Sequence, residues 1–168
     1  MLCRNGSSRS VRCMKKMPIR IANIVRGRKK STHDISSLSQ TKTFAKKIAS
    51  TLHGGDVIAL QGDLGAGKTT FVQLLARELG ILTRVTSPTF VIMNIYPVHG
   101  GDTRIRSLRH LCHIDAYRLT TSDELLAIGV GEYIGRSDTV VVIEWAERVR
   151  ALLPSGALWI TFQVMNIC

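Results

Sequence analysis

Short apolar runs recur along the chain and predict the strands of a buried sheet. These runs lie at residues 56–61, 90–96, 111–116 and 139–143. Residues 158–164 differ, because apolar and polar side chains alternate there, as in a strand with one exposed face. The polar segment at residues 97–109 contains a glycine pair and is predicted to be a long hairpin loop.

Apolar residues at helical spacing predict helices between these runs. The first helix is defined by Phe44, Ile48 and Leu52, and the second by Phe71, Leu74, Leu75 and Leu79. Ser39 or Thr41 would cap the first helix, and a glycine pair would end it. A capping box of Thr121 and Glu124 begins another helix. Because strands and helices interleave, the sequence predicts an α/β layered sheet.

The segment Gly62–Thr69 carries the most specific chemical motif. It fits the pattern G-x-x-x-x-G-K-S/T of the phosphate-binding P-loop, with a strand before it and a helix after it. The backbone amides of such a loop enclose a phosphate chain. Lys68 would place its charge on the β- and γ-phosphates, and the Thr69 hydroxyl would bind Mg²⁺. The sequence therefore predicts a nucleotide site.

Two acidic residues at predicted strand ends can complete a Mg²⁺ site. Glu144 directly follows one apolar strand, and Asp115 ends another. Ligands of α/β folds lie beyond the carboxyl ends of strands, where either acid would meet the metal directly or through water. Each can instead be a solvated or capping acid. Thr89 is a candidate γ-phosphate sensor or part of a simple turn. For His113 and Trp145, the sequence allows either a structural or an active-site role.

Positive charge is concentrated near the N-terminus. The formal net charge is +11, yet residues 1–33 hold ten Lys/Arg and no acid, so residues 34–168 carry only +1. We predict a basic arm over residues 1–33 and a P-loop domain over residues 34–168. The arm has three interpretations: a disordered segment that contacts RNA or another polyanion, an organelle transit peptide, or sequence upstream of the true start codon.

Composition disfavours several other classes of protein. No apolar run approaches the ~20 residues of a membrane span, so no membrane association is expected. The four cysteines lack zinc-ligand spacing and are expected to be reduced thiols. The chain is therefore expected in the cytoplasm, unless the arm directs import into an organelle. A guanine-specific N-K-x-D element is missing, which disfavours a GTPase.

Five motifs, in this order and spacing, resemble the TsaE (YjeE) family. They are Gly62–Phe71 (GDLGAGKTTF), Ser87–Phe90 (SPTF), His113–Leu119 (HIDAYRL), Gly131–Ile134 (GEYI) and Val142–Glu147 (VIEWAE). The P-loop alone would not be specific, whereas the SPTF, H-x-D-x-YRL and EW elements together are. The resemblance covers residues 36–164.

This resemblance implies a compact P-loop domain with a mixed sheet, which binds ATP and hydrolyses it slowly with Mg²⁺. It also implies a partner, the TsaB–TsaD complex, which transfers threonylcarbamoyl onto adenosine 37 of tRNAs that read ANN codons. In that family the ATPase does not perform the transfer. It docks on the complex, and its nucleotide cycle resets the complex between turnovers. The tRNA would thus be an indirect partner.

By the resemblance, each residue of the family's site has a matching position in this sequence. Phosphate binding is assigned to Asp63, Leu64, Gly65, Ala66, Gly67, Lys68, Thr69 and Thr70, the last at the α-phosphate. Thr69 and Glu144 would bind Mg²⁺. The catalytic set is Lys68, Thr89, Asp115 and Glu144, in which Thr89 matches the switch threonine. Whether Asp115 or Glu144 orients the attacking water stays open.

Two other functions remain as alternatives. A P-loop small-molecule kinase would need a lid with arginines, for which the Arg104–Arg109 loop is a weak candidate. A nucleic-acid-binding module would act through the basic arm, because the nearly neutral remainder lacks clustered cations. The chain departs from the TsaE pattern in this arm, in the long 97–109 loop and in ending soon after its last strand.

Overall fold

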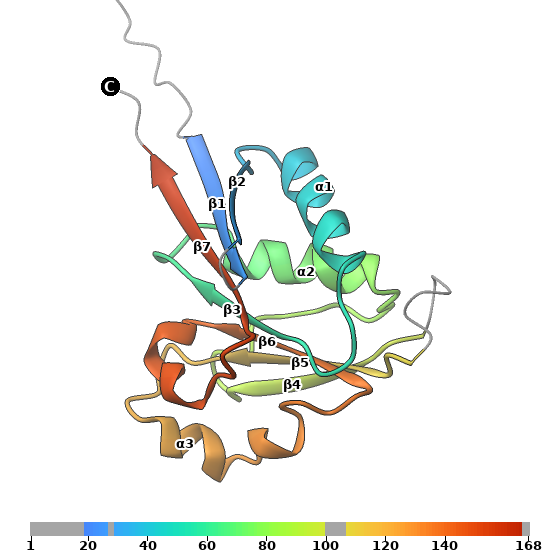
Figure 1. The fold of residues 1–168 in the computed structure, drawn as a ribbon, viewed down its shortest axis with the longest axis vertical. Helices are drawn as coiled ribbons and strands as arrows, with labels where there is room; N and C mark the ends of the chain where they lie inside the picture. The colour runs from blue at the N-terminus through green and yellow to red at the C-terminus, as the bar shows by residue number, and fades with distance from the viewer. Residues whose placement is uncertain (1–18, 27–28, 100–106, 166–168) are drawn as a thin grey trace, which may run out of the picture.

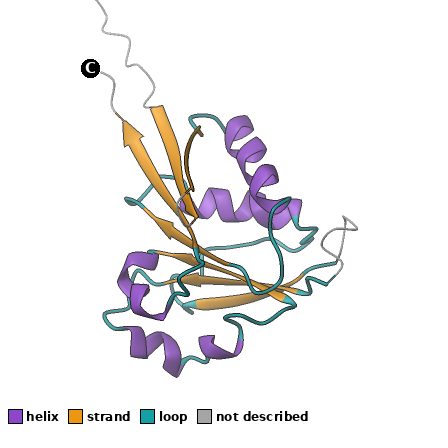
Figure 2. Ribbon diagram, in the orientation of Figure 1, coloured by secondary structure: helices purple, strands orange, loops and turns teal. Residues whose placement is uncertain are grey.

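The computed structural model describes residues 19–26, 29–99 and 107–165. These residues form a seven-stranded mixed sheet with helices on both faces (Figure 1; Figure 2). The strands are β1 (Ile19–Arg26), β2 (Lys29–Asp34), β3 (Val57–Gln61), β4 (Met93–Pro97), β5 (His110–Asp115), β6 (Thr139–Glu144) and β7 (Leu158–Met165). The helices are α1 (Leu38–Ala49), α2 (Lys68–Glu78), α3 (Ser122–Ala127) and the 3-10 helices η2 (Val130–Glu132) and η3 (Ala146–Leu152). The predicted α/β domain with a mixed central sheet flanked by helices is confirmed.

The order of the strands explains where a ligand can bind. The order is β2-β1-β7-β3-β6-β5-β4. Strands β7, β3, β6 and β5 are parallel to one another, and β1, β2 and β4 each pair antiparallel with their neighbours. The parallel strands therefore end at one common edge of the sheet, and the loop after β3 enters α2 at that edge.

The predicted boundary between arm and domain at residues 33/34 is wrong for the described residues. Strand β1 pairs with β7 along its length, and β2 pairs with β1 at the edge of the sheet. Ala22 of β1 is fully buried, while Lys29 and Lys30 of β2 are exposed. A basic strand is compatible with folding at a sheet edge, where its charged side chains remain solvated. Residues 1–18 of the predicted arm lie outside the described residues.

Two further elements differ from the expectation. Helix α1 is capped by Ser37 rather than by Ser39 or Thr41, because Ser37 and Gln40 form a reciprocal capping box. The predicted strand at residues 90–96 begins only at Met93. The Pro88 carbonyl accepts hydrogen bonds from the amides of Val91 and Ile92 and thereby closes a turn. Phe90, in this turn, is 84% exposed.

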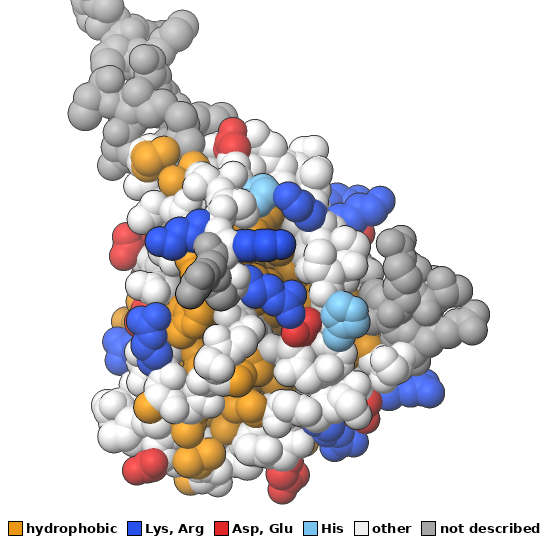
Figure 3. Space-filling model, viewed as in Figure 1, with side chains coloured by type: hydrophobic (Ala, Val, Ile, Leu, Met, Phe, Trp, Pro, Cys, Tyr) orange, Lys and Arg blue, Asp and Glu red, His pale blue; other side chains and the backbone are white. Residues whose placement is uncertain are grey.

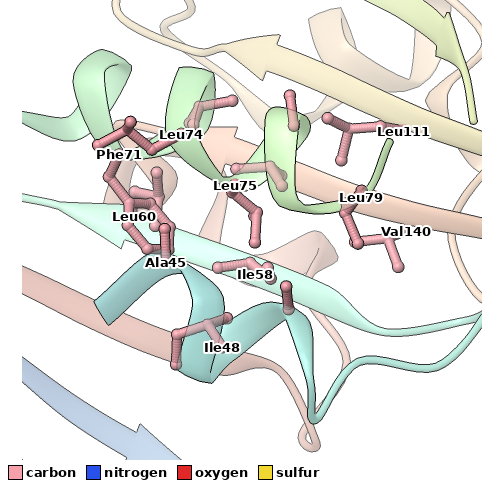
Figure 4. Packing of buried hydrophobic residues seen from close by; sticks show 14 of the residues in the cluster. Ala45, Ile48, Ile58, Leu60, Phe71, Leu74, Leu75, Leu79, Leu111 and Val140 are labelled. Atoms are coloured by element: carbon pink, nitrogen blue, oxygen red, sulfur yellow. The ribbon is translucent and has the colours of Figure 1, made fainter. Parts of the chain in front are cut away.

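Two apolar cores hold the sheet between its helices. Side chains of α1 and α2, such as Ile48 and Leu75, pack on Ile58 of β3 (Figure 4). A second cluster lies on the other face, under α3 and η3, and includes Cys112. Burial raises the pKa of the Cys112 thiol to about 12, in line with the predicted reduced cysteine. Among the described residues, no helix is long and apolar enough to cross a membrane.

Candidate nucleotide site

The P-loop connects β3 to α2 at the carboxyl edge of the parallel strands. At two of its glycines, the backbone conformation or the lack of space disfavours any side chain. Gly67 caps α2 with a φ of 106°, a left-handed conformation that disfavours side chains. A Cβ at Gly62 would lie 2.4 Å from the Phe162 carbonyl oxygen of β7. The glycines therefore allow the loop to curl tightly against the sheet, with α2 pointing its N-terminus into the site.

Lys68 lies inside the loop and is only 4% exposed. Its ammonium donates to the Gly62 carbonyl at 2.6 Å and to the Asp63 carbonyl at 2.9 Å. It also lies 3.9 Å from the ring centroid of Trp145, a cation–π distance. Burial lowers the pKa of Lys68, and the surrounding carboxylates, Glu144 foremost, oppose that shift. The cation is therefore held where a phosphate chain would enter.

Trp145 belongs to this site and is not simply a core residue. Its φ of 58° is rare for a bulky side chain and turns the backbone sharply after β6. Its ring contacts that of Tyr117, with centroids 5.0 Å apart. The indole thus lies beside Lys68 and lines the cavity of the site, and it also packs against the second apolar cluster.

Glu144 joins the end of β6 to the start of α2. The Thr69 hydroxyl donates to one Glu144 carboxylate oxygen at 2.9 Å, and His113 contacts the other at 2.9 Å. A hydroxyl and a carboxylate are hard oxygen donors of the kind Mg²⁺ prefers. Within the described part of the chain, no group of three or more His, Cys, Asp or Glu can hold a metal. The Thr69 hydroxyl and the Glu144 carboxylate would fit a Mg²⁺ that takes its other ligands from phosphates and water.

Asp115 organises the neighbouring side of the cavity. One of its oxygens accepts hydrogen bonds from Thr89 at 2.6 Å and from Ser87 at 3.1 Å. The other accepts the Tyr117 amide at 3.0 Å. Asp115 is paired in register with Glu144 of β6, so the two carboxylates lie side by side at the strand ends. The SPTF segment and the H-x-D motif therefore meet here.

A cavity of about 290 Å³ brings most of the predicted site residues together. The predicted site residues that line the cavity are Leu64, Gly65, Gly67, Lys68, Thr69, Thr70, Thr89, Asp115 and Glu144. Asp63 and Ala66 do not line it, and the Ala66 amide instead donates to the Asp63 carbonyl at 3.2 Å. Ser87, Tyr117 and Arg20 also line the cavity, and the sequence did not indicate them as site residues.

Arg20 was missed because it belonged to the predicted arm. The structure places it on β1, where its amide donates to the Ser36 hydroxyl at 2.9 Å. It also lines a second cavity of about 130 Å³, which shares Gly67 and Thr70 with the first. The β-branched residues Ile19, Ile21, Ile24 and Val25 were the available indication of a strand there.

The fold and the site together define a P-loop nucleotide-binding protein with an ATPase-type fold. The family model "Threonylcarbamoyl adenosine biosynthesis protein TsaE" matches residues 35–166, and the chain belongs to this family. Two relatives are each named tRNA threonylcarbamoyladenosine biosynthesis protein TsaE. The protein of Treponema pallidum is 39% identical over 77% of this chain and 88% of its own length. That of Bacillus subtilis is 40% identical over 74% of this chain and 72% of its own.

A solved structure agrees with this assignment. The crystal structure of Bacillus subtilis YdiB aligns with a TM-score of 0.57 and 31% sequence identity. The alignment covers 87% of this chain and 78% of that one. The similarity therefore extends well beyond the P-loop unit.

Proposed function

We propose that this protein is an ATPase that supports threonylcarbamoylation of adenosine 37 in tRNA through a TsaB–TsaD-type complex. The observation that carries the proposal is the contact between Thr69 at the P-loop and Glu144 at the end of β6. This pair joins the Mg²⁺-binding hydroxyl of a P-loop to an acid of Walker B type. The names of the related proteins supply the pathway.

The proposed roles follow from the positions of the side chains. Lys68 and the loop amides hold the phosphates, and Thr70 meets the α-phosphate. Thr69 and Glu144 hold Mg²⁺, which when bound supplies positive charge to the phosphate oxygens. Asp115 is occupied by two hydroxyls, so we assign it to orienting Thr89 toward the γ-phosphate. Glu144, which bonds to the Thr69 hydroxyl proposed at the metal, is assigned to placing a Mg²⁺-bound attacking water.

The kinase alternative receives little support. Residues 104–106 of its candidate lid, the Arg104–Arg109 loop, lie outside the described residues. Arg109, which is described, donates its amide to the Asp138 carbonyl at 2.7 Å, beside the first residues of β5 and β6. The nucleotide site lies at the opposite, carboxyl ends of these strands, which is the wrong edge of the sheet for a lid.

Stimulation by the partner complex tests the proposal. We expect the purified full chain to hydrolyse ATP slowly with Mg²⁺, and a purified TsaB–TsaD complex to raise that rate at least several-fold. Phosphate release would be measured with and without the complex and with and without Mg²⁺. Hydrolysis that ignores the complex would contradict the role in tRNA modification. Hydrolysis that persists in excess chelator would contradict the Mg²⁺ site.

A basic surface favours direct tRNA binding as a second candidate function. The described residues up to the end of α1 hold seven Lys/Arg and one Asp. Five of them are exposed lysines on β2 and α1, two elements that contact each other, and are named the lysine face: Lys29, Lys30, Lys42, Lys46 and Lys47. Lysine and arginine side chains gather over this part of the molecule in Figure 3. Because β2 is folded into the domain, the premise of a nearly neutral domain does not hold.

Salt-dependent RNA binding tests the lysine face. We expect the full chain to bind tRNA. In K29Q/K30Q the negative slope of log affinity against log salt should become shallower by about 1 to 2, because fewer phosphate contacts form and fewer counterions are released on binding. The matched control is R77Q/R84Q, which removes the same charge from two exposed arginines elsewhere. Equal slopes for the wild-type chain and K29Q/K30Q would exclude these two lysines from the binding surface.

A further inference from the structure

His113 and Glu144 form a buried pair beneath the nucleotide site. The two residues are 0% and 2% exposed. The imidazole Nε2 lies 2.9 Å from Glu144 Oε1, while Glu144 Oε2 accepts the Thr69 hydroxyl at 2.9 Å. Each carboxylate oxygen therefore has a different partner, one within the sheet and one on α2. The carboxylate cannot rotate without breaking both hydrogen bonds.

Stability does not account for an imidazole at this position. An ionised carboxylate only accepts hydrogen bonds, so Nε2 donates to it. The other ring nitrogen, Nδ1, is buried and has no partner among the described residues. A buried polar atom without a partner costs about 1–3 kcal/mol. Neighbouring strand residues on the same face, such as Leu111 and Val142, are apolar, and an apolar side chain would avoid this cost.

The strand register makes His113 the residue that reaches Glu144. Residues two apart on a strand face the same side, so His113 and Asp115 both lie on the face toward α2. Asp115 is opposite Glu144 in register, and His113 is opposite Val142. Asp115 is already bonded to Thr89, Ser87 and the Tyr117 amide. His113 is thus the side chain of β5 that bonds to the Glu144 carboxylate.

We propose that His113 is a positioning residue for Glu144. By fixing Oε1, it keeps Oε2 directed at Thr69 and at the Mg²⁺ that this pair would hold. Outer partners of a metal ligand set its orientation, and losing one typically lowers metal affinity or activity about 10–100-fold. The inference rests on the proposed function, because it gives Glu144 a role at the metal.

Three substitutions separate the hydrogen bond from the packing. H113L keeps a side chain of similar size but removes the donor. H113Q can present an amide N–H near the position of Nε2, whereas H113N presents it nearer the position of Nδ1. The ADP affinity of the full chain of each variant would be measured twice, once with Mg²⁺ present and once in excess chelator. ATP hydrolysis would be measured as a function of Mg²⁺ concentration. Thermal unfolding would establish that each variant is folded.

Positioning predicts a selective loss. We expect H113L and H113N to need about 10-fold more Mg²⁺ for half-maximal hydrolysis and to lose most of the Mg²⁺-dependent gain in ADP affinity. Their affinity for ADP in chelator should stay within about 3-fold of the wild type. H113Q should recover most of the Mg²⁺ response, because it restores the donor to Glu144.

Several results would overturn this inference. If H113L responds to Mg²⁺ like the wild type, Glu144 does not need the imidazole. If ADP affinity in chelator falls as far as affinity with Mg²⁺, His113 supports the packing of the whole site rather than the carboxylate. If H113Q is as impaired as H113L, the donor is not the relevant feature. A wild-type protein without any Mg²⁺ response would instead refute the proposed metal site itself.

Discussion

The variant K68A is expected to lose ATP hydrolysis by about 100-fold or more. Lys68 supplies the one cation that the P-loop itself places in the site, and removing a preorganised donor to developing charge typically costs about 100- to 1,000-fold in turnover. The side chain also ties the loop together through the carbonyls of Gly62 and Asp63. Its loss therefore removes both phosphate stabilisation and a support of the loop's shape.

The measurement is steady-state phosphate release at saturating ATP, together with nucleotide affinity and the midpoint of thermal unfolding. The matched control is K46A, which removes an exposed lysine from α1. K46A should hydrolyse ATP at the wild-type rate. Because Lys68 is buried, the unfolding midpoint has to show that K68A remains folded. A folded K68A that hydrolyses ATP normally would refute the assigned role of Lys68.

Local sequence information was sufficient to place the P-loop and the two acids at the strand ends. The P-loop motif fixed the order of strand, loop and helix, and the structure has β3 and α2 on either side of it. Glu144 and Asp115 were placed correctly because a carboxylate that follows an apolar strand must lie at the end of that strand. Their alignment in adjacent parallel strands then brings them together. These inferences needed only neighbouring residues and one rule about α/β sheets.

Contacts between distant segments were not predictable in the same way. Strand β1 is stabilised by pairing with β7, about 140 positions later, and its basic composition suggested an unfolded arm. Arg20 was missed for that reason. The bond between His113 and Glu144 depends on the register of β5 against β6, which apolar patterns do not define. The turn before β4 depends on Pro88 and on a positive φ at Ile92, which overrides the strand preference of the apolar residues.

The variant E144Q is expected to separate turnover from nucleotide binding. Glutamine keeps the size of the side chain and can still bond to Thr69 and His113, so the fold and the loop should persist. It removes the negative charge that a Mg²⁺ ligand supplies and that would orient the attacking water. We expect turnover to fall about 100-fold or more, while ADP affinity in chelator stays within about 3-fold of the wild type.

Turnover and affinity would be measured on the same preparations, with E132Q as the matched control because Glu132 is an exposed acid on η2. E132Q should leave both quantities unchanged. If E144Q loses turnover and chelator affinity to the same extent, Glu144 maintains the shape of the cavity and does not act on metal and water. If turnover survives in E144Q, Asp115 becomes the residue that orients the water, since it is the other carboxylate lining the cavity.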